Sequence, residues 1–548
     1  WADFLPRPLH PPTPKTQSEC VLIAYPVLKG AKIHIMNNKY DFYGGLESFD
    51  RIVLRIVSYI EDKLHDTVKI MESKIEIIET QNSKTKITVA FPEPERNIEY
   101  YQHGLNRMSI SVDSDQESSD IDSYISKLSH IFTPEEEKHL SNYTPWLHKL
   151  VKKDYFDNRI LSDCLVIFRE HSLISVYNIF AIFKKFGLKP ENTVYYSKGD
   201  RCRNIYRIEE SFKDKGYGVF VLSPFESITT TGRSEDEKIT PEASDRVYSE
   251  LKPYFDKARS EHLKVIVFDD GGLIVTTVID LFTKEYGDLI HGYIETTKGG
   301  MHAINSRPDL GVTVINLADS SIKNLLNTVI GHSIVQRLRE MIPHVGLRGQ
   351  NVVVVGYGTL GRAIAKDLRR LGMSAYVCDI DDERIFEALS DGFPVSKDAA
   401  YLIKEFKPTL IMGCTGLDAL TYDNLSQIRK DTYVATVSSN EIKQSYPKFD
   451  ETSKLEFIDN YARTYTLPNG KKLVILGNGA SLNLYNGEGA NHSEYQPFLA
   501  AMIETIAYSA ENGPVKGKIG LDTDIADKIL RNANILGNYL EESNSLIG

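Results

Sequence analysis

One segment restricts the fold of this chain more than any other, because it places a glycine turn between a buried strand and an amphipathic helix. Residues 351–372 read NVVVV, then GYGTLG, then RAIAKDLRRLG. Consecutive valines are typical of a strand buried on both faces, and Leu360, Ile364 and Leu368 recur on one helix face. A strand, a tight turn and a helix in this order predict a βαβ unit and therefore a parallel sheet.

The glycines of the turn, Gly356, Gly358 and Gly361, have the GxGxxG spacing. In this context the first glycine permits a tight turn, the second lets the backbone approach a pyrophosphate, and the third lets the helix pack closely on the strand. The helix start, with Thr359 and Leu360, would present free N–H groups to the anion. The pattern therefore predicts a dinucleotide-binding turn, against the alternative of a purely structural glycine turn in another α/β fold.

Two further features extend this predicted site. Asp379 ends the next strand, about 20 residues on, where a carboxylate hydrogen-bonds a ribose hydroxyl and repels a 2′-phosphate, which favours NAD over NADP. A second turn, containing Thr415 and Gly416, follows the strand PTLIM and would lie along the cofactor edge of the same sheet. We therefore predict a Rossmann domain that binds NAD around residues 350–437.

Short apolar runs alternate with helical segments from about residue 160 onward, which is typical of parallel sheets covered by helices. The predicted fold class is α/β, with the Rossmann NAD-binding domain and a second Rossmann-like substrate domain. A small α+β domain precedes them, since residues 21–92 read as two strands (VLIAYPV and KIHIM), an amphipathic helix (residues 46–64) and two more strands (SKIEIIET and KTKITVAF).

The serine-rich acidic run 111–123 predicts a solvated linker, and Thr133 with Glu136 predicts a capping box that opens a helix. The expected division is 1–123 for the N-terminal domain with its linker, 124–343 for the substrate domain, 344–483 for the NAD-binding domain, 484–520 completing the substrate domain, and 521–548 as a helical tail. Two lobes that exclude water would close about hinges near 342–347 and 483–489.

The composition excludes several function classes. A chain of 548 residues is too long for one core, and its net charge of -11 argues against a surface that tracks nucleic-acid phosphates. No stretch reaches 18 apolar residues, so no membrane span is expected. The five cysteines are scattered without a CxxC pair, which predicts no zinc or other metal site and fits a reducing cytoplasm.

Four segments in order carry a resemblance to a known family. They are VIVFDDGG, HGYIETTKGGMH, INLADSSIKNLLNTVIG and GQNVVVVGYGTLGRAIAKDL. Over roughly residues 158–508 the chain resembles the S-adenosylhomocysteine hydrolases, as a divergent member with an extra N-terminal domain. The resemblance implies a homo-oligomer, either a dimer or a tetramer, and an enzyme that uses NAD to oxidise the 3′-hydroxyl of a nucleoside. The ketone acidifies the neighbouring 4′-proton, the 5′-thiol is eliminated, water adds, and the ketone is reduced again.

By position, the resemblance also implies roles for five residues. Lys323 matches the lysine that assists removal of the hydroxyl proton, and Glu295 matches the carboxylate that holds the sugar hydroxyls. Asp270 and His171 match the acid/base pair near C4′ and C5′. Asn483 matches the asparagine beside the nicotinamide carboxamide. Taken one at a time, Asp270 could instead cap a helix and His171 could be a solvated turn histidine.

The chain also departs from the family. Asn327 and Thr328 stand where the family has an Asp-Asn pair, so a base partner for Lys323 is missing, and Ala318 replaces an asparagine. Ser439 stands where a histidine binds the sugar region. The adenine-side segment with Ser-Thr-Gln-Asp is replaced by SKGDRCRNIY, so adenine recognition does not follow from the resemblance.

Three hypotheses remain open. The first is an enzyme that oxidises a sugar hydroxyl of a nucleoside-like or thioether-nucleoside substrate. The second is an NAD-binding pseudoenzyme with a regulatory or partner-binding role. The third is a 2-hydroxy-acid dehydrogenase, which ranks last because no arginine stands at the place that such an enzyme needs after the cofactor domain. In the altered segment, Lys198, Arg201 and Arg203 would meet an anionic group of a different substrate or would simply be solvated.

Overall fold

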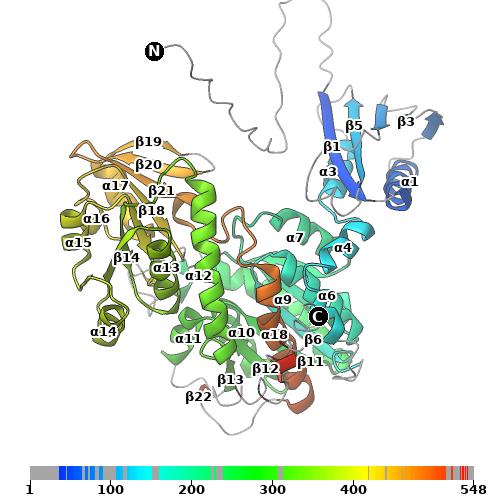
Figure 1. Ribbon diagram of the computed structural model, residues 1–548. Coiled ribbons are helices and arrows are strands. Elements are labelled where there is room, and N and C mark those ends of the chain that lie inside the picture. Colours follow the sequence, from blue (N-terminus) through cyan, green and yellow to red (C-terminus); the bar gives the residue numbers. More distant parts are fainter. Residues whose placement is uncertain are drawn as a thin grey trace, which may run out of the picture. The chain divides into compact units, whose positions relative to one another are not determined.

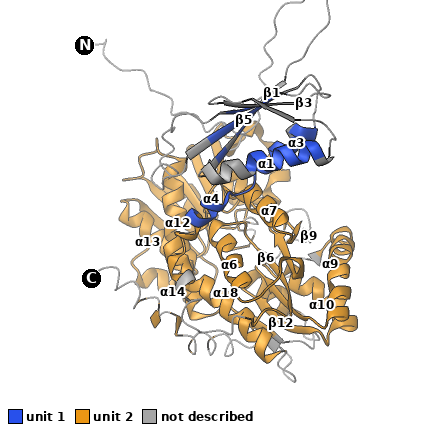
Figure 2. Ribbon diagram, turned by 90° about the vertical axis from the view of Figure 1, so that its right-hand side faces the viewer, with its two compact units in different colours: residues 1–139 blue, residues 140–548 orange. Residues whose placement is uncertain are grey.

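The computed structural model separates into two compact units, residues 1–139 and residues 140–548 (Figure 2). Each unit is described by itself. The structure describes residues 36–44, 46–63, 68–71, 75–80, 86–90, 106–114, 120–150, 159–223, 228–229, 238–306, 313–417, 419–438, 441–458, 461–513 and 520–521, with single positions beyond these at 527, 531, 534, 535, 537, 538 and 540. The helical tail expected for 521–548 therefore falls largely outside the described residues.

The first unit is a small α+β domain, as predicted. Its antiparallel sheet has the order β1-β5-β4-β3-β2, and apolar residues of α1, α3 and the sheet form one core that includes Ile56, Ile60 and Val89. The elements are β1 (Met36–Gly44), α1 (Leu46–Lys63), β2 (Val68–Met71), β3 (Ile75–Thr80), β4 (Lys86–Ala90), β5 (Asn106–Ser114) and α3 (Asp120–Ser129).

The linker expected at 111–123 corresponds to regular structure at both of its ends. Its first four residues complete β5, and its last four begin α3. Met108, Ile110 and Val112 alternate along the strand and are buried, while the serines and aspartate between them hid this pattern in the sequence. The strand VLIAYPV and residues 32–35 of KIHIM lie outside the described residues.

The capping box is confirmed. The Thr133 N–H donates to Glu136 Oε2 at 2.9 Å, and the Glu136 N–H donates to Thr133 Oγ1 at 3.3 Å. The helix α4 (Pro134–Ser141) begins directly after the threonine.

The first sheet of the second unit is parallel throughout and has the order β22-β13-β12-β11-β6-β7-β8. Its central strands are fully buried, because helices cover both faces as the apolar runs predict (Figure 1). The strands are β6 (Cys164–Glu170), β7 (Thr193–Ser197), β8 (Gly218–Val221), β11 (Lys264–Asp269), β12 (Ile290–Glu295), β13 (Thr313–Asn316) and β22 (Gly520–Leu521). The helices are α6 (Ile174–Lys185), α7 (Ile205–Asp214), α9 (Pro241–Glu261), α10 (Leu273–Tyr286), α11 (Lys298–Asn305) and α18 (His492–Asn512).

The second sheet is a Rossmann sheet. Its six parallel strands follow the order β16-β15-β14-β17-β18-β21, which is the 3-2-1-4-5-6 order of dinucleotide-binding folds, and two antiparallel strands extend it. The strands are β14 (Asn351–Val355), β15 (Ser374–Cys378), β16 (Val395–Ser396), β17 (Leu410–Gly413), β18 (Thr432–Thr436), β19 (Lys454–Ile458), β20 (Ala462–Thr466) and β21 (Lys472–Leu476). The predicted fold class is confirmed.

The long helix α12 (Ser321–Met341) packs against α13 (Thr359–Arg370) of the Rossmann sheet and against α18 of the first sheet (Figure 1). In both sheets the strand order reverses once, between β6 and β11 in the first and between β14 and β17 in the second. Ligands of open α/β sheets bind beyond the carboxyl ends of the strands at such a reversal. The topology therefore marks one candidate site in each sheet.

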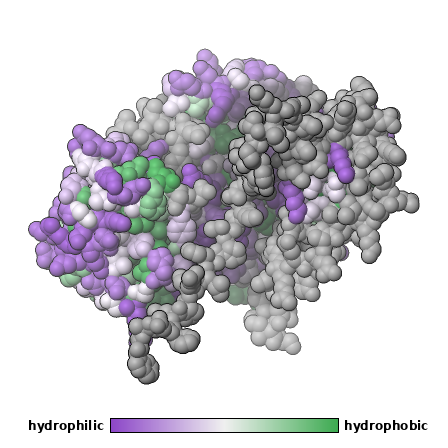
Figure 3. All heavy atoms as spheres, turned by 90° about the horizontal axis from the view of Figure 1, so that it is seen from above, coloured by the Kyte–Doolittle hydropathy of each residue, from purple (hydrophilic) through white to green (hydrophobic). Residues whose placement is uncertain are grey.

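The edge strand β19 and Tyr461 beyond it expose apolar side chains. Leu455, Phe457, Ile458 and Tyr461 are each between 41% and 51% exposed. Figure 3 shows hydrophobic residues gathered among hydrophilic ones on this lobe. Among the described residues, no helix combines the length and apolar character needed to cross a bilayer.

Candidate active site

The glycine turn lies at the strand reversal of the Rossmann sheet. Gly356 has a φ of +99°, and a Cβ there would lie 2.7 Å from the backbone of Cys414, at the end of the neighbouring strand β17. A Cβ on Gly361 would lie 2.0 Å from the Gly356 carbonyl oxygen. Around Gly358 there is open space instead, with nothing within 4 Å of an added Cβ. The first and third glycines are therefore required by packing, and the second leaves room for a ligand.

The start of α13 has the properties of an anion-binding site. Its N-cap is Gly358, and no side chain caps the helix there. The N–H groups of Thr359 and Leu360 lie in the first turn, where intrahelical partners are lacking. An uncapped helix start beside open space fits the pyrophosphate of a dinucleotide, so these residues would hold NAD when it is bound.

Asp379 follows β15 and braces the glycine turn. Its Oδ2 accepts the Tyr357 N–H at 2.6 Å, and its Oδ1 accepts the Asp381 N–H at 3.0 Å. The carboxylate is partly exposed. A ribose hydroxyl could therefore reach it, as the sequence predicts, while the bond to Tyr357 keeps the turn in shape.

Replacing Asp379 with alanine is expected to weaken NAD binding by about 10- to 100-fold, because charge-assisted hydrogen bonds contribute about 1.5–3 kcal/mol each. Isothermal titration with NAD measures the change. Asp381, which caps α14 (Asp382–Ser390) and belongs to no predicted cofactor contact, supplies the matched control Asp381→Ala. Unchanged NAD affinity in Asp379→Ala would show that the cofactor ribose lies elsewhere.

The second predicted turn rests on a buried carboxyl group that sequence reasoning missed. Glu441 is fully buried, and its Oε2 accepts the Thr415 N–H at 3.2 Å and also bonds the Gly416 backbone. Burial raises the pKa of Glu441 to about 7, although these backbone bonds lower it. Thr415 and Gly416 therefore lie beside Gly356 on the cofactor edge, and their backbone hydrogen bonds to Glu441 hold them there.

Asn483 is buried, and both ends of its amide are paired within the chain. Its Oδ1 accepts the Ser481 hydroxyl at 2.7 Å, and its Nδ2 donates to the Gly489 carbonyl at 2.9 Å. In the described structure it shapes the segment that leads to α18. The role beside the nicotinamide stays a prediction.

The four predicted catalytic residues come from four elements and meet at the strand reversal of the first sheet. His171 follows β6, Asp270 follows β11, Glu295 ends β12, and Lys323 lies in the first turn of α12. Carboxyl ends of parallel strands share one edge of a sheet, which explains how residues so distant in sequence converge. The structure therefore brings His171 and Lys323 together around the carboxylate of Asp270, and Glu295 lies beside them.

Asp270 is the centre of this cluster. Its Oδ1 accepts a hydrogen bond from Lys198 Nζ and lies 3.5 Å from His171 Nε2. Its Oδ2 accepts the Thr296 hydroxyl at 2.7 Å and lies 4.0 Å from Lys323 Nζ. Burial raises the pKa of Asp270, but the attraction of the nearby cations, of which Lys198 contributes most, outweighs it and holds the pKa well below the usual range. Asp270 is thus an ionised carboxylate between two lysines.

Its neighbour Asp269 has the structural role that was the alternative for Asp270. Asp269 Oδ2 accepts the N–H groups of Ile274 and Val275, at 2.6 Å and 3.0 Å, at the start of α10, and its Oδ1 pairs with Arg169. The pair Asp269 and Asp270 therefore divides into a helix cap and a site carboxylate.

His171 is oriented by a carboxylate that the sequence did not single out. Its Nδ1 is hydrogen-bonded to Asp200 Oδ2, and its Nε2 faces Lys198 at 3.2 Å. A carboxylate on one ring nitrogen sets the tautomer and the orientation of the imidazole. His171 is therefore a built part of the site and is not a solvated turn histidine.

Two buried carboxyl groups flank Asp270. Glu295 Oε1 accepts the N–H groups of Gly271 and Thr297, while its Oε2 has no partner among the described residues. Glu170 Oε2 is likewise without a partner there. Burial raises the pKa of both, and repulsion from Asp270 adds to it. An unpaired buried carboxyl oxygen is costly, so each is suited to pair with a ligand hydroxyl.

The altered segment 197–206 changes its meaning in the structure. Lys198 pairs with Asp270, so its charge is already neutralised. Arg201 and Arg203 are exposed, and their backbones bond Asn486 and Gly487, on the segment after Asn483. The hypothesis that Lys198, Arg201 and Arg203 together bind an anionic group of the substrate is therefore wrong for Lys198. The sequence signal for the site was the aspartate retained at the end of SKGD, which is Asp200.

The missing base partner of Lys323 is replaced in space. Asn327 stands one turn along α12, but Asp270 Oδ2 lies 4.0 Å from Lys323 Nζ, and the centroid of the Phe498 ring lies 4.5 Å from it. Ala318 is buried in the core of the first sheet. Ser439 lies outside the described residues.

The same cluster has the residue types of a metal site, because Glu170, His171 and Asp270 place ligand atoms within 4.8 Å of one another. The ammonium of Lys198 already donates to Asp270 and lies against His171. A positive charge at that point repels a cation. The expectation of no metal stays a prediction that the position of Lys198 supports.

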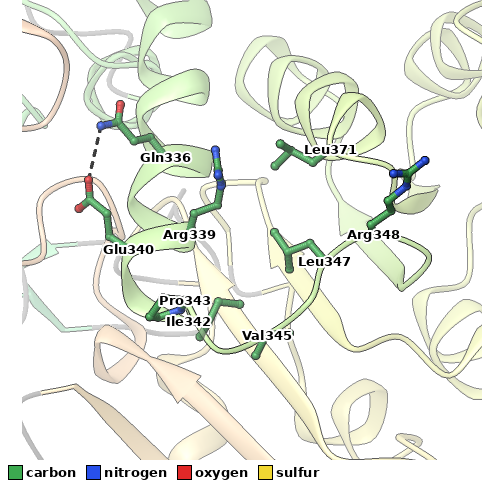
Figure 4. Close-up of a pocket in the computed structure, with 9 residues that line it drawn as sticks. All are labelled: Gln336, Arg339, Glu340, Ile342, Pro343, Val345, Leu347, Arg348 and Leu371. Atoms are coloured by element: carbon green, nitrogen blue, oxygen red, sulfur yellow. Dashed lines mark hydrogen bonds between the residues drawn. The ribbon is translucent and has the colours of Figure 1, made fainter. Parts of the chain in front are cut away.

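A surface pocket of about 590 Å³ lies elsewhere, at the carboxyl end of α12 (Figure 4). It includes Arg339, Arg348 and Leu371, together with residues of the predicted hinge 342–347. Lys323 lies at the other end of this helix of 21 residues, which is roughly 30 Å long at 1.5 Å per residue. None of the predicted site residues lines the pocket.

Comparison with known proteins agrees with the geometry. Residues 326–489 match the family model described as S-adenosyl-L-homocysteine hydrolase, NAD binding domain. An adenosylhomocysteinase of Gloeothece citriformis (strain PCC 7424) is 28% identical over 285 residues, 50% of this chain and 64% of the relative. One of Thermotoga maritima is 26% identical over 382 residues, 68% of this chain and 86% of the relative. An S-inosyl-L-homocysteine hydrolase of Methanopyrus kandleri is 28% identical over 237 residues, 42% of this chain and 54% of the relative.

The chain thus spans less than two thirds of the length of the first and third of these relatives. Among solved structures, one of the subunits of dipicolinate synthase from Bacillus halodurans is similar with a TM-score of 0.33 at 12% identity, covering 63% of this chain and 98% of that one. The family match confirms the prediction of a divergent relative of these hydrolases and of NAD as the cofactor.

Proposed function

We propose, from the premise that this chain is adenosylhomocysteinase-like and carries an NAD-binding domain, that it is an NAD-dependent enzyme that oxidises a sugar hydroxyl of a nucleoside or thioether nucleoside. The observation that supports it most is that Lys323 and His171 both lie close to the Asp270 carboxylate, at the strand reversal of the first sheet. A chain that only bound NAD would not need a buried, charged cluster of this kind.

The residues divide the work by position. When bound, NAD supplies the acceptor for the hydride of the oxidised hydroxyl carbon. Lys323 receives the hydroxyl proton as its neutral amine, and the Asp270 carboxylate beside it stabilises the ammonium that forms. His171 and Asp270 hold or move the proton at the neighbouring carbon and at the leaving sulfur. Glu295, whose free Oε2 is buried, pairs with a sugar hydroxyl.

The substrate belongs to the neutral nucleosides rather than to their phosphates. Lys198 is neutralised by Asp270, and the unpaired groups of the cluster are two carboxyls with raised pKa values. Such groups bind hydroxyls, and in their ionised form they repel phosphates. The base is left open, because one relative is an adenosylhomocysteinase and another an S-inosyl-L-homocysteine hydrolase. We also propose, from the resemblance, a cytoplasmic homo-oligomer.

The test has two stages. Protein purified without added cofactor is denatured, and mass spectrometry of the released small molecules is expected to show NAD. The intact protein is then mixed with a panel of adenosine, inosine and their homocysteine thioethers, and NADH absorbance is followed. Reduction of the bound cofactor by a member of the panel supports the enzyme. If NAD is released but no nucleoside of the panel reduces it, the result would favour the alternative, an NAD-binding pseudoenzyme. The changes at Ala318, Asn327 and Thr328 support that alternative.

A further inference from the structure

We propose that Lys198 is a positioning residue that acts as the built-in cation of the site, holding Asp270 as a carboxylate and fixing the tautomer of His171 so that Nε2 is the basic ring nitrogen. The proposal rests on the proposed function for its chemical purpose. The geometry that carries it does not depend on a cofactor or a substrate.

The position of Lys198 is unusual for a lysine. It follows β7 directly, and its side chain is only 11% exposed. Its Nζ donates to Asp270 Oδ1 and lies 3.2 Å from His171 Nε2. Burying an ammonium is costly unless a carboxylate is close, so a lysine held there indicates that its charge is used.

The hydrogen bonds around His171 assign its tautomer. An ammonium has only protons to offer, so His171 Nε2 must present its lone pair to Lys198. The proton of the neutral ring then lies on Nδ1 and points to Asp200 Oδ2. Lys198 and Asp200 thus hold the ring from its two sides, and the nitrogen that faces Asp270 is the basic one.

The charges that face this point favour one cation. Asp270, Asp200 and Glu170 attract the ammonium of Lys198, while Arg169 repels it. Asp270 also faces Lys323, but at 4.0 Å rather than in a hydrogen bond. Of the attractive contributions that lower the pKa of Asp270, that of Lys198 is the largest. Without Lys198, the Asp270 carboxylate would therefore lose the largest single contribution that compensates its burial.

The sign of the effect follows from removing a positive charge. In Lys198→Met the pKa of Asp270 rises, since less charge opposes the burial of the carboxylate. The imidazolium of His171 becomes easier to form, because the ammonium no longer repels it. An opposite charge next to a carboxylate changes its pKa by about one to three pH units, and loss of the like charge next to the imidazole acts in the same upward direction.

The experiment uses the full chain with labelled histidine. Spectra of His171 are assigned with His171→Gln, and its titration is followed by nitrogen-detected NMR in the unmodified protein, in Lys198→Met and in Lys198→Arg. We expect the neutral ring to carry its proton on Nδ1 in the unmodified protein, an upward shift of about one pH unit in Lys198→Met, and recovery in Lys198→Arg. Lys213, which is 48% exposed on α7, supplies the control Lys213→Met, with no shift.

Other outcomes overturn the proposal. An unchanged His171 titration in Lys198→Met, or a neutral ring with its proton on Nε2 in the unmodified protein, would contradict it. Zn²⁺ bound by the unmodified protein would do so as well, because the ion would have to displace the ammonium between Asp270 and His171. If Lys198→Met does not fold, Lys198→Gln keeps a hydrogen-bond donor without the charge and decides by the same readout.

The same variants separate this proposal from the proposed function. If a nucleoside reduces the bound cofactor, the acid limb of that rate is expected to move up by about one pH unit in Lys198→Met. If no nucleoside does, the NMR titration still decides whether Lys198 sets the state of His171. A shifted His171 titration in Lys198→Met without any nucleoside oxidation would therefore contradict the proposed enzyme activity and support the positioning role of Lys198.

Discussion

Replacing Lys323 with alanine is expected to lower the rate of nucleoside oxidation by about 10²- to 10⁴-fold, the range by which a positioned acid or base accelerates proton transfer. The Lys323 side chain is 14% exposed, and its Nζ lies 4.0 Å from the Asp270 carboxylate and 4.5 Å from the centroid of the Phe498 ring. Of the four predicted catalytic residues, Lys323 is the one on α12, the helix that also packs against α13 of the Rossmann lobe. Its loss removes the group that takes the hydroxyl proton.

The measurement is the rate of NADH absorbance with the nucleoside identified from the panel, at saturating substrate. NAD content and melting temperature are measured beside it, so that a lost cofactor or a lost fold is recognised. Lys284 is exposed near the end of α10, and Lys284→Ala is expected to leave the rate unchanged. A normal rate in Lys323→Ala would remove this lysine from the mechanism.

Two substitutions in the glycine turn are expected to fail in different ways. In Gly361→Ala the new methyl group would lie 2.0 Å from the Gly356 carbonyl oxygen, a backbone atom, and 3.1 Å from Cβ of Cys414. Overpacking of this kind costs about 1–3 kcal/mol or more of unfolding free energy. The strand and α13 must move apart, so the Rossmann lobe is expected to melt earlier and to lose NAD.

Gly358→Ala is the matched opposite. Its φ of -66° suits alanine, and nothing lies within 4 Å of the added methyl group, so the melting temperature is expected to stay unchanged. The methyl group would occupy the space where the backbone approaches the pyrophosphate. NAD binding is expected to weaken by about 10- to 100-fold, the loss of one or two charge-assisted hydrogen bonds.

Calorimetry for unfolding and titration with NAD for affinity, applied to both variants, test this contrast. A Gly358→Ala protein with full NAD affinity would mean that no phosphate lies over the turn. A Gly361→Ala protein that melts like the unmodified chain would contradict the close approach of α13 to its strand.

Much of the Rossmann lobe could be predicted from the sequence because its signals are local. Four valines, three spaced glycines and an amphipathic helix are consecutive, and each rule acts within a few residues. The strand β5 was missed for a local reason as well. Its buried Met108, Ile110 and Val112 alternate with polar residues, and the acidic serines beyond them suggested a linker.

Much of the candidate site could not be predicted from local patterns. Lys198 and Asp200 lie in a segment where the sequence departs from the family pattern, and no motif marks Glu170 or Glu441. Their meaning depends on which side chains lie opposite them, which adjacent positions in a sequence do not reveal. Asp269 and Asp270 show this plainly, since neighbouring identical residues cap a helix and anchor the site respectively.

The sequence by itself determined that this chain builds parallel sheets, where its glycine turn lies and which dinucleotide that turn suits, because backbone sterics and hydrophobic periodicity are properties of neighbouring residues. Only the tertiary structure decided that Asp270 replaces the absent partner of Lys323 and that Lys198 stands between Asp270 and His171. Electrostatic interactions act through space, and residues 171, 198, 270 and 323 become neighbours only when the carboxyl ends of the strands meet at one edge of the sheet.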